Sequence, residues 1–371
     1  MLTEEQGYLR KTVRELLAER AGRGSVPEPG AVADYDRELW KLMAQQIGLH
    51  GLAVPEEFGG AGYGPVELAV VFEEMGAVLL NSPFLASIGL VATILRETGD
   101  RAACADYLPA IASGETVGAF AFLEAGGRWE ESEIHVEAVE ADGGWQISGQ
   151  KRYVVHGCAA DILVVAARTE AGVSLFVVEA DAPGVDRAPL DVLDPTRPQA
   201  TVVFAGAPAR LIGAPGDGWA VLRRAFDLAA IYLACEQVGG AARCLDISVA
   251  YAKSREQFGR PIGSFQAIKH KCADMLVTVE LARSAALEAA TAAAADQPDV
   301  AMLASLAKAV CSEGFVRCAT ETIQIHGGIG FTWEHPAHLY YKRARSGEVL
   351  LGAPGYHREL LALRGAGELP V

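Results

Sequence analysis

Two stretches in the last third of the chain place charged, amide and glycine residues where the backbone must turn. In the first, Arg255 ends a Tyr-Ala-Lys-Ser-Arg run, and Phe258–Gly263 must turn sharply before a helix begins near Ser264. A guanidinium at such a corner can hold a phosphate through two parallel hydrogen bonds. The ordinary alternative for one Arg in an acidic protein is a surface ion pair with Glu256 or contact with a helix C-terminus.

In the second stretch, Gln324 precedes the run His326-Gly327-Gly328-Ile329-Gly330. Paired glycines let backbone amides come close to an anionic group, although a Gly-Gly-x-Gly run taken alone is usually only a turn. The histidines in and beyond this run lack the spacing of a metal-ligand set, so no metal site is expected. They are His326, His335, His338 and His357.

Both stretches lie among long helical segments. Apolar residues recur with helical period over 220–254, 263–295 and 298–325, each long enough to cross a bundle, and a further helix is expected around 338–350. These segments predict a C-terminal four-helix bundle over residues 216–371. The N-terminal segment, residues 1–116, has the same period, with Leu9, Val13, Leu16 and Leu17 on one face.

Between the helical segments, residues 117–215 alternate with a period of two. Short β-branched and apolar runs are separated by Gly, Pro and Asp turn signals, which is typical of a compact antiparallel barrel or sandwich. The expected strands are 134–139, 144–148, 162–167, 173–178 and 200–204. The sequence therefore predicts an α+β chain in the order helical, β, helical.

Composition narrows the classes of function. The 371 residues are 51% hydrophobic and carry a net charge of −15, so nucleic-acid or membrane-surface binding is not expected, and an anionic ligand must meet locally placed cations. Seven scattered cysteines with no Cys-x-x-Cys pair indicate buried thiols in a reducing compartment. Because the first twenty residues lack a continuous apolar core, no signal peptide or membrane anchor is expected, and the interpretation is a cytoplasmic protein.

The helical–β–helical order and two long motifs resemble the acyl-CoA dehydrogenase family over nearly the whole chain. The motifs are SREQFGRPIGSFQAIKHKCADM at Ser254–Met275 and QIHGGIGFTWEHPAHLYYKRA at Gln324–Ala344. Gly48–Gly64 and Trp145–Gly157 resemble the family more weakly. The resemblance implies an N-terminal all-α domain at 1–116, a middle β-barrel or sandwich domain at 117–215 and a C-terminal four-helix bundle domain at 216–371.

The resemblance also implies FAD as the cofactor. In the family, Arg255 and Gln257 would contact the flavin pyrophosphate, with Phe258 beside it, and Phe265 and Gln266 would approach FAD. The second motif would hold the adenosine and pyrophosphate end of an FAD whose flavin ring lies in a neighbouring subunit. This arrangement implies a dimer pair, usually assembled into a tetramer. The second motif's site residues are Gln324, Ile325, His326, Gly327 and Gly328.

The chain departs from the family at the catalytic base. Active members remove the substrate's α-proton with a Glu while hydride passes from the β-carbon to flavin N5. At the commonest position of that Glu the chain has Leu351, and at the alternative position on the first bundle helix it has Ala229. The family's next residue, an Arg, is Ala230 here. No catalytic residue is therefore assigned to this chain.

Segments that face the flavin ring in the family are altered as well. The Thr-Glu-Pro-Gly-Ala-Gly-Ser-Asp-like loop is replaced by Leu123–Trp129, which lacks the small hydroxyl residues. The Trp-Ile-Thr-Asn-like segment reads Tyr153–His156, so Val155 stands where a Thr hydroxyl would bond the flavin. The chain keeps the residues that serve a neighbour's FAD and lacks those that hold its own flavin ring and substrate.

This division resembles actinobacterial α2β2 acyl-CoA dehydrogenases, several of them associated with steroid side-chain degradation. The hypothesis is that this chain is the non-catalytic partner, inactive alone, of a family member that carries the Glu and binds most of the acyl-CoA. One alternative is a self-sufficient homotetramer with Glu236 or Glu348 as a non-standard base. The other is a flavin-free scaffold protein of the same fold.

Overall fold

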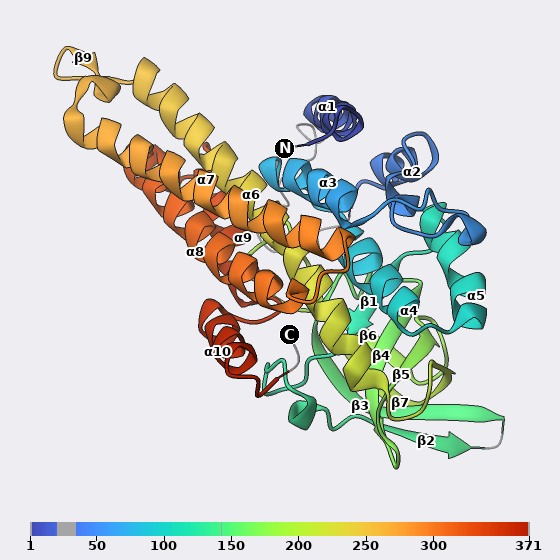
Figure 1. Cartoon of the computed structure of the whole chain (residues 1–371). Helices are drawn as coiled ribbons and strands as arrows, with labels where there is room; N and C mark the ends of the chain where they lie inside the picture. The colour runs from blue at the N-terminus through green and yellow to red at the C-terminus, as the bar shows by residue number, and fades with distance from the viewer. Residues whose placement is uncertain (1, 21–34, 142, 370–371) are drawn as a thin grey trace. The chain divides into compact units, whose positions relative to one another are not determined.

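The computed structural model describes residues 2–20, 35–141 and 143–369, which form two compact units. The bundle unit takes its described residues from Met1–Gly24, Pro65–Leu80 and Ala230–Val371. The sheet unit takes them from Ser25–Gly64 and Asn81–Ala229. The boundary lies within helix α6, so this helix contributes to both units. The elements are labelled in Figure 1.

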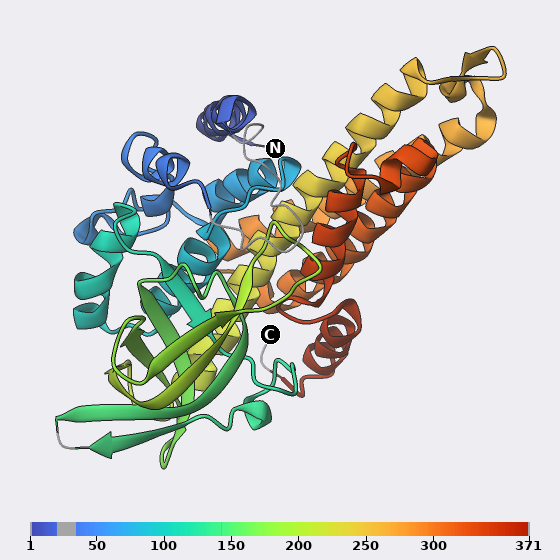
Figure 2. The same ribbon diagram turned by 180° about the vertical axis from the view of Figure 1, so that it is seen from behind.

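The bundle unit is built on three long helices that run side by side (Figures 1 and 2). Small residues make their packing close: Ala282, Ala286 and Ala289 recur along one buried face of α7. Larger side chains, including Met275 and Phe315, fill the core between the helices. The helices are α1 (Glu4–Arg20), α3 (Pro65–Ala77), α6 (Gly218–Ser254), α7 (Gln266–Ala294), α8 (Val300–His326), α9 (Ala337–Val349) and α10 (Pro354–Gly365), with single turns η6 (Ile262–Ser264) and η7 (Gly327–Phe331) and a short hairpin of β8 (Glu256–Gln257) and β9 (Arg260–Pro261).

Helices α3 and α6 cross with their backbones in contact. A Cβ atom on Gly239 of α6 would lie 1.8 Å from the carbonyl oxygen of Glu73, and one on Gly76 of α3 would lie 1.9 Å from that of Glu236. Neither site can accept a side chain. Two glycines on facing helices thus fix how closely the N-terminal helix α3 approaches the C-terminal bundle.

The sheet unit contains one sheet of strands in the order β1-β4-β2-β3-β7-β5, with β6 on β7. Since β5 also pairs with β4, the sheet closes on itself, which leaves fewer open edges. Its interior is filled by Leu163, Val165, Phe176, Val202 and Phe204 among others. The strands are β1 (Gly118–Ala121), β2 (Glu137–Ala141), β3 (Gly144–Val155), β4 (Ile162–Thr169), β5 (Gly172–Glu179), β6 (Val185–Pro189) and β7 (Gln199–Ile212).

Short helices complete the sheet unit. Asp36 and Asp100 begin two of them, because each side chain accepts hydrogen bonds from two backbone N–H groups of the following turn. The elements are α2 (Arg37–Gln45), η2 (Leu49–Gly51), η3 (Glu56–Phe58), the π-helical η4 (Leu85–Ala92), α4 (Thr93–Glu97), α5 (Arg101–Ala112) and η5 (Glu131–Glu133).

The predicted α+β fold class, with N-terminal helices, a middle β region and a C-terminal helical region, is confirmed. Strands β1 and β6 and helix α10 were not predicted, and β3 continues past residue 148 because bulges at 147/148 and between 151 and 154 preserve its pairing with β7. The domain boundaries after residues 116 and 215 stay a prediction.

The expectation that the cysteine thiols are buried is wrong for Cys158, which is exposed. Within the described ranges, no helix is long and apolar enough to cross a membrane.

Candidate functional site

Arg255 is the first residue beyond the last turn of α6, and hydrogen bonds fix its backbone on both sides. Its N–H donates to the Tyr251 carbonyl at 2.8 Å, and its own carbonyl accepts from the Ile262 N–H at 2.7 Å. The guanidinium is exposed, and within the part of the chain that the structure describes it forms no ion pair with Glu256 or any other carboxylate. This cation is available to an external anion.

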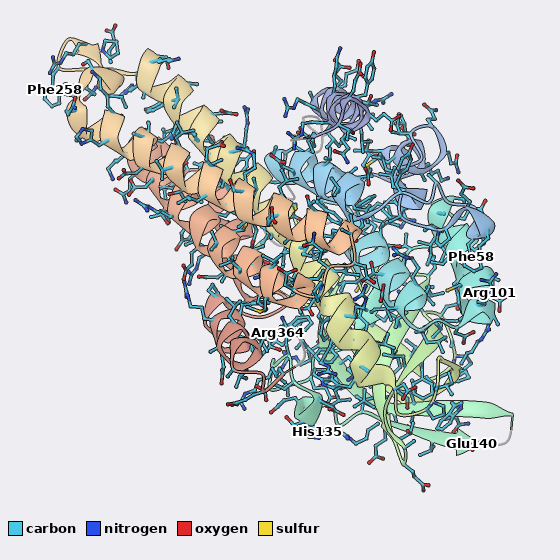
Figure 3. The ribbon with its side chains drawn as sticks, viewed as in Figure 1. Phe58, Arg101, His135, Glu140, Phe258 and Arg364 are labelled. Carbon is cyan, nitrogen blue, oxygen red and sulfur yellow. The ribbon has the colours of Figure 1, made fainter. Side chains whose placement is uncertain are left out.

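The hairpin after Arg255 presents an exposed aromatic ring. Phe258 has a φ of 55° and is 91% exposed, at the far end of the bundle unit (Figure 3). A bulky residue held in the left-handed region with its ring in water indicates a surface shaped for a ligand or partner. The ring of Phe265 lies edge-on to that of Phe258, with centroids 6.0 Å apart. The Arg260 guanidinium covers the Phe265 ring, 4.2 Å from its centroid.

The two predicted amides beside the hairpin are exposed and only locally bonded. Nε2 of Gln257 donates to the backbone carbonyl of Glu256 at 2.9 Å, and Nε2 of Gln266 lies 2.9 Å from Nε2 of His270. These contacts join neighbours in the chain, so both amide groups can turn to an external ligand at little cost.

The second motif follows the end of α8. His326 is buried and its Nδ1 lies 2.7 Å from the Thr322 carbonyl, so Nδ1 carries the proton. Nε2 is buried without a hydrogen-bond partner among the described residues, and burial lowers the pKa of the imidazole. Gly327 has φ 64° and ψ −142°, a conformation suited to Gly, and a Cβ on Gly327 or Gly328 would meet nothing within 4 Å.

The structure brings the two motifs together at one end of the bundle unit. The ring of Tyr251, four residues before Arg255, stacks on His326 with centroids 4.3 Å apart. Ile325 lies in the same core cluster as Tyr251 and is 5% exposed, so its side chain packs inward. Gln324 is exposed. The exposed surface formed by Arg255, Gln257, Phe258, Gln266, Gln324, Gly327 and Gly328 is called the tip surface below.

The positions predicted for a family-type base are apolar and buried. Leu351 is 3% exposed, and Ala229 and Ala230 are fully buried on α6. Both alternative carboxylates are paired: Glu236 lies 2.9 Å from Arg343, and Glu348 lies 2.7 Å from Arg345. None of these groups is a free proton acceptor.

The turn that holds Leu351 is fixed by two buried basic side chains. Nζ of Lys308 donates to the carbonyls of Glu348 and Gly352 and to Oγ of Ser312, at 3.2, 3.1 and 2.9 Å. Nε2 of His357 lies 2.8 Å from the Leu351 carbonyl, and burial lowers the His357 pKa to about 3. Leu351 itself has a φ of 59°, so the clamps maintain a strained turn.

In the sheet unit, one carboxylate fastens the loop that is predicted to correspond to the family's flavin loop. Oε1 of Glu124 accepts from the N–H groups of His135 and Val136, and from Nζ of Lys151 at 2.8 Å. Burial lowers the Lys151 pKa to about 8 against the opposing attraction of Glu124. Burial alone would raise the pKa of Glu124, but Lys151 and the two backbone donors outweigh it and lower that pKa.

The Lys151–Glu124 pair and the contacts of Lys308 with the turn at Leu351 were not predicted from the sequence. A signal existed for Lys151, since it lies four residues after the buried Ile147 in an alternating strand, and a buried Lys requires a counter-charge. Lys308 had a comparable signal in the helical period of α8, because it falls four residues from the buried positions Ala304 and Ser312.

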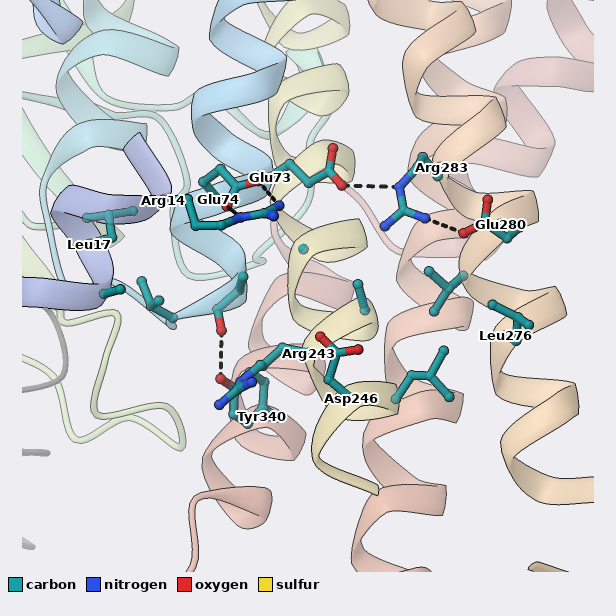
Figure 4. A pocket seen from close by; sticks show the side chains of 17 residues that line it. Arg14, Leu17, Glu73, Glu74, Arg243, Asp246, Leu276, Glu280, Arg283 and Tyr340 are labelled. Atoms are coloured by element: carbon teal, nitrogen blue, oxygen red, sulfur yellow. Dashed lines mark hydrogen bonds and ion pairs between the residues drawn. The ribbon is translucent and has the colours of Figure 1, made fainter. Parts of the chain in front are cut away.

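A cavity of about 770 Å³ opens elsewhere in the bundle unit, between α1, α3, α6 and α7 (Figure 4). Arg14 and Glu74 line it as a bidentate pair, and Arg283 bridges Glu73 and Glu280 across it. No residue of the tip surface lines this cavity. Tyr340, near the end of the second motif, is among its lining residues.

Family profiles described as the acyl-CoA dehydrogenase N-terminal, middle and C-terminal domains match residues 3–115, 119–204 and 216–365. The chain belongs to the acyl-CoA dehydrogenase family. It is similar to acyl-CoA dehydrogenase IpdE2 of Mycobacterium tuberculosis, with 37% identity over 96% of this chain and 95% of that protein. The acyl-CoA dehydrogenase resemblance in the sequence is therefore confirmed.

Two solved acyl-CoA dehydrogenase-like structures are similar to the chain along its length. One is a variant of the Tcur3481–Tcur3483 steroid ACAD, with 31% identity, a TM-score of 0.88 and coverage of 98% and 99% of the two chains. The other is the ChsE4–ChsE5 complex of Mycobacterium tuberculosis, with 28% identity, a TM-score of 0.89 and coverage of 100% and 99%. Family membership supports an oxidoreductase acting on a CH–CH bond.

Proposed function

We propose that this chain is the partner subunit that completes the FAD pocket of a catalytic acyl-CoA dehydrogenase chain in an α2β2 complex. The complex would introduce an α,β double bond into an acyl-CoA thioester. One contrast carries the proposal. The tip surface offers the unpaired Arg255 guanidinium and an unobstructed glycine backbone, whereas Leu351 and Ala229 leave no proton acceptor at either predicted base position.

The residues of the tip surface fit the phosphate and adenosine end of FAD. Arg255 supplies a positive charge with paired donors for a pyrophosphate, and the absence of Cβ atoms at Gly327 and Gly328 lets backbone N–H groups approach it. Phe258 offers an apolar face beside them. When bound, FAD supplies the acceptor for a hydride. This chain's residues would bind and orient it, and the partner chain would remove the proton.

The relatives support a heteromeric assembly and a bulky substrate. One similar structure is described as a complex of two proteins and another as a steroid ACAD named for two polypeptides. On this basis we propose that the substrates are CoA thioesters of steroid side chains. The partner would be a second acyl-CoA dehydrogenase-family chain that retains the Glu.

The direct test is to purify the chain alone and together with a family member encoded beside it. The complex is expected to carry tightly bound FAD and to oxidise acyl-CoA, whereas the lone chain is expected to do neither. Full FAD occupancy and turnover by the lone chain would contradict the assignment and favour a homotetramer. A colourless, inactive complex would favour the flavin-free scaffold.

Arg255 gives a residue-level test with a control on the same hairpin. Arg255→Ala is expected to lower the FAD content of the complex, measured as flavin absorbance per protein, and Arg255→Lys to restore only part of it because an ammonium cannot make the paired contact. Arg260→Ala removes a neighbouring exposed Arg that covers Phe265, and is expected to retain FAD. Equal FAD content in both Ala variants would show that Arg255 is only structural.

A further inference from the structure

A row of polar and aromatic side chains follows the contact between α6 and α8 toward the tip surface. Spacings of three and four residues place the members of each set on one helix face. The row consists of Cys244, Ser248 and Tyr251 on α6 and Cys318, Thr322 and His326 on α8. Oγ of Ser248 donates to Oγ1 of Thr322 at 3.0 Å, and that hydroxyl lies 3.2 Å from the Cys244 carbonyl oxygen. These contacts join the two helices one turn before the tip surface begins.

The His326 ring ends this row and packs against two other rings. Its centroid lies 4.3 Å from that of Tyr251, with planes 26° apart, and 4.2 Å from that of His335, with planes 39° apart. Nδ1 of His326 is bonded to the Thr322 carbonyl, and Nε2 is buried. Neither ring nitrogen is therefore offered to an external ligand, and the imidazole acts through its packing.

The Tyr251–His326 stack joins the two halves of the tip surface. The Tyr251 carbonyl accepts the hydrogen bond of the Arg255 N–H at 2.8 Å, one helical turn along α6. His326 directly precedes Gly327, whose φ of 64° and ψ of −142° turn the chain at the end of α8. A shift of one ring against the other would move Arg255 relative to the glycine pair. Donors that share one anion need distances of about 2.7–3.2 Å, so such a shift would cost hydrogen bonds.

We propose that Tyr251 and His326 are positioning residues: their stack fixes Arg255 relative to Gly327 and Gly328, so that both halves of the tip surface hold one pyrophosphate together. This inference rests on the proposed partner role and adds two residues that act without touching FAD. Without the stack, the guanidinium and the glycine turn are still present, but FAD binding must order them, and that ordering lowers affinity.

The test measures the affinity of the complex for FAD, by titrating FAD into the cofactor-free complex and following flavin fluorescence. Tyr251→Leu removes the ring and is expected to raise the Kd for FAD by about tenfold. Tyr251→Phe keeps the ring, and the Tyr251 hydroxyl has no hydrogen bond among the described residues, so this variant should bind FAD like the unaltered complex. Tyr251→Met, which fills a similar volume, should show the same loss as Tyr251→Leu and replaces it if that variant fails to assemble.

A double-mutant cycle distinguishes positioning from a general loss of stability. If the stack acts through Arg255, Tyr251→Leu should weaken FAD binding by less than about threefold when Arg255 is already Ala, because the group that it positions is gone. The control for lost core packing is Phe315→Leu, eleven residues before His326 on α8. It is expected to lower the temperature of thermal unfolding and to keep the affinity for FAD.

Three results would overturn the positioning role. They are unchanged FAD affinity in an assembled Tyr251→Leu or Tyr251→Met complex, an equal loss with and without Arg255, and an equal loss in Phe315→Leu. In each case the proposed partner role stands if Arg255→Ala by itself weakens FAD binding. If Arg255→Ala and Tyr251→Leu both leave FAD binding unchanged, the tip surface does not hold FAD and both proposals fail.

Discussion

Nη1 of Arg343 on α9 lies 2.9 Å from Oε1 of Glu236 on α6, and the two side chains are 3% and 7% exposed. Nη2 of the same Arg lies 3.4 and 3.3 Å from the carbonyls of Leu79 and Leu80, beyond the end of α3. The buried Arg343 side chain therefore ties α9 to α6 and to the turn after α3. Because the Glu236 carboxylate is already paired with Arg343, it is poorly suited to act as a base.

Glu236→Gln is expected to lower the free energy of unfolding by about 3–5 kcal/mol, because it removes the buried carboxylate that pairs with the Arg343 guanidinium. Denaturant titration of the purified complex measures the loss. Glu236→Gln combined with Arg343→Met should recover part of it. A variant of unchanged stability that had lost only turnover would instead identify Glu236 as a base and revive the self-sufficient alternative.

Gly239→Ala is expected to prevent folding of the bundle unit, since the added Cβ would lie 1.8 Å from the Glu73 carbonyl oxygen, which neither helix backbone can vacate. The matched control is Gly355→Ala in α10, where a Cβ meets nothing within 4 Å. That change should be neutral or stabilise by up to about 1 kcal/mol. Soluble yield and thermal denaturation compare the two, and a stable Gly239→Ala protein would refute the contact.

Stability should fall as pH drops below the unfolded-state histidine pKa of 6.5. Burial lowers the folded-state pKa of both His50 and His357 to about 3. Between these pKa values the unfolded chain binds a proton at each site and the folded chain does not. The contribution is therefore complete above pH 6.5 and is lost toward pH 3, at about 1.4 kcal/mol per pH unit for each group.

His50→Gln tests one of these groups. Its unfolding free energy should depend less steeply on pH between 6 and 4, by the slope of about one proton. The control is His135→Gln, an exposed site on the sheet unit (Figure 3), which should keep the original slope. An unchanged slope in His50→Gln would mean that the buried imidazole is protonated in the folded chain.

Lys308→Met should loosen the turn at Leu351. The change removes the ammonium that satisfies the carbonyls of Glu348 and Gly352, and each buried acceptor left unpaired costs about 1–3 kcal/mol. Hydrogen exchange of the amides at residues 349–353 is expected to accelerate relative to the rest of α9. Exchange that accelerates equally throughout the bundle unit would indicate a general loss of stability and not a local clamp.

Local sequence patterns predicted much of the fold. The helical period located α6, α7 and α8 to within a few residues at each end, because side chains three and four positions apart must share one face. Strand β1 was not predicted, because its sequence Gly-Ala-Phe-Ala is short and fully buried and shows no alternation of apolar and polar residues. β6 ends in a Pro and becomes a strand only by pairing with β7 at the edge of the sheet.

The sequence by itself showed that Leu351 and Ala229 cannot accept a proton in any conformation, and it predicted an anion site at Arg255 and the paired glycines. Only the tertiary structure decided which groups meet. Arg343 reaches Glu236 across 107 positions, Tyr251 stacks on His326, and Trp129 packs against both Phe122 and Phe226. These contacts depend on how the helices and strands pack. Packing is set by the shapes of side chains throughout the core, and the spacing of residues along the chain does not encode those shapes.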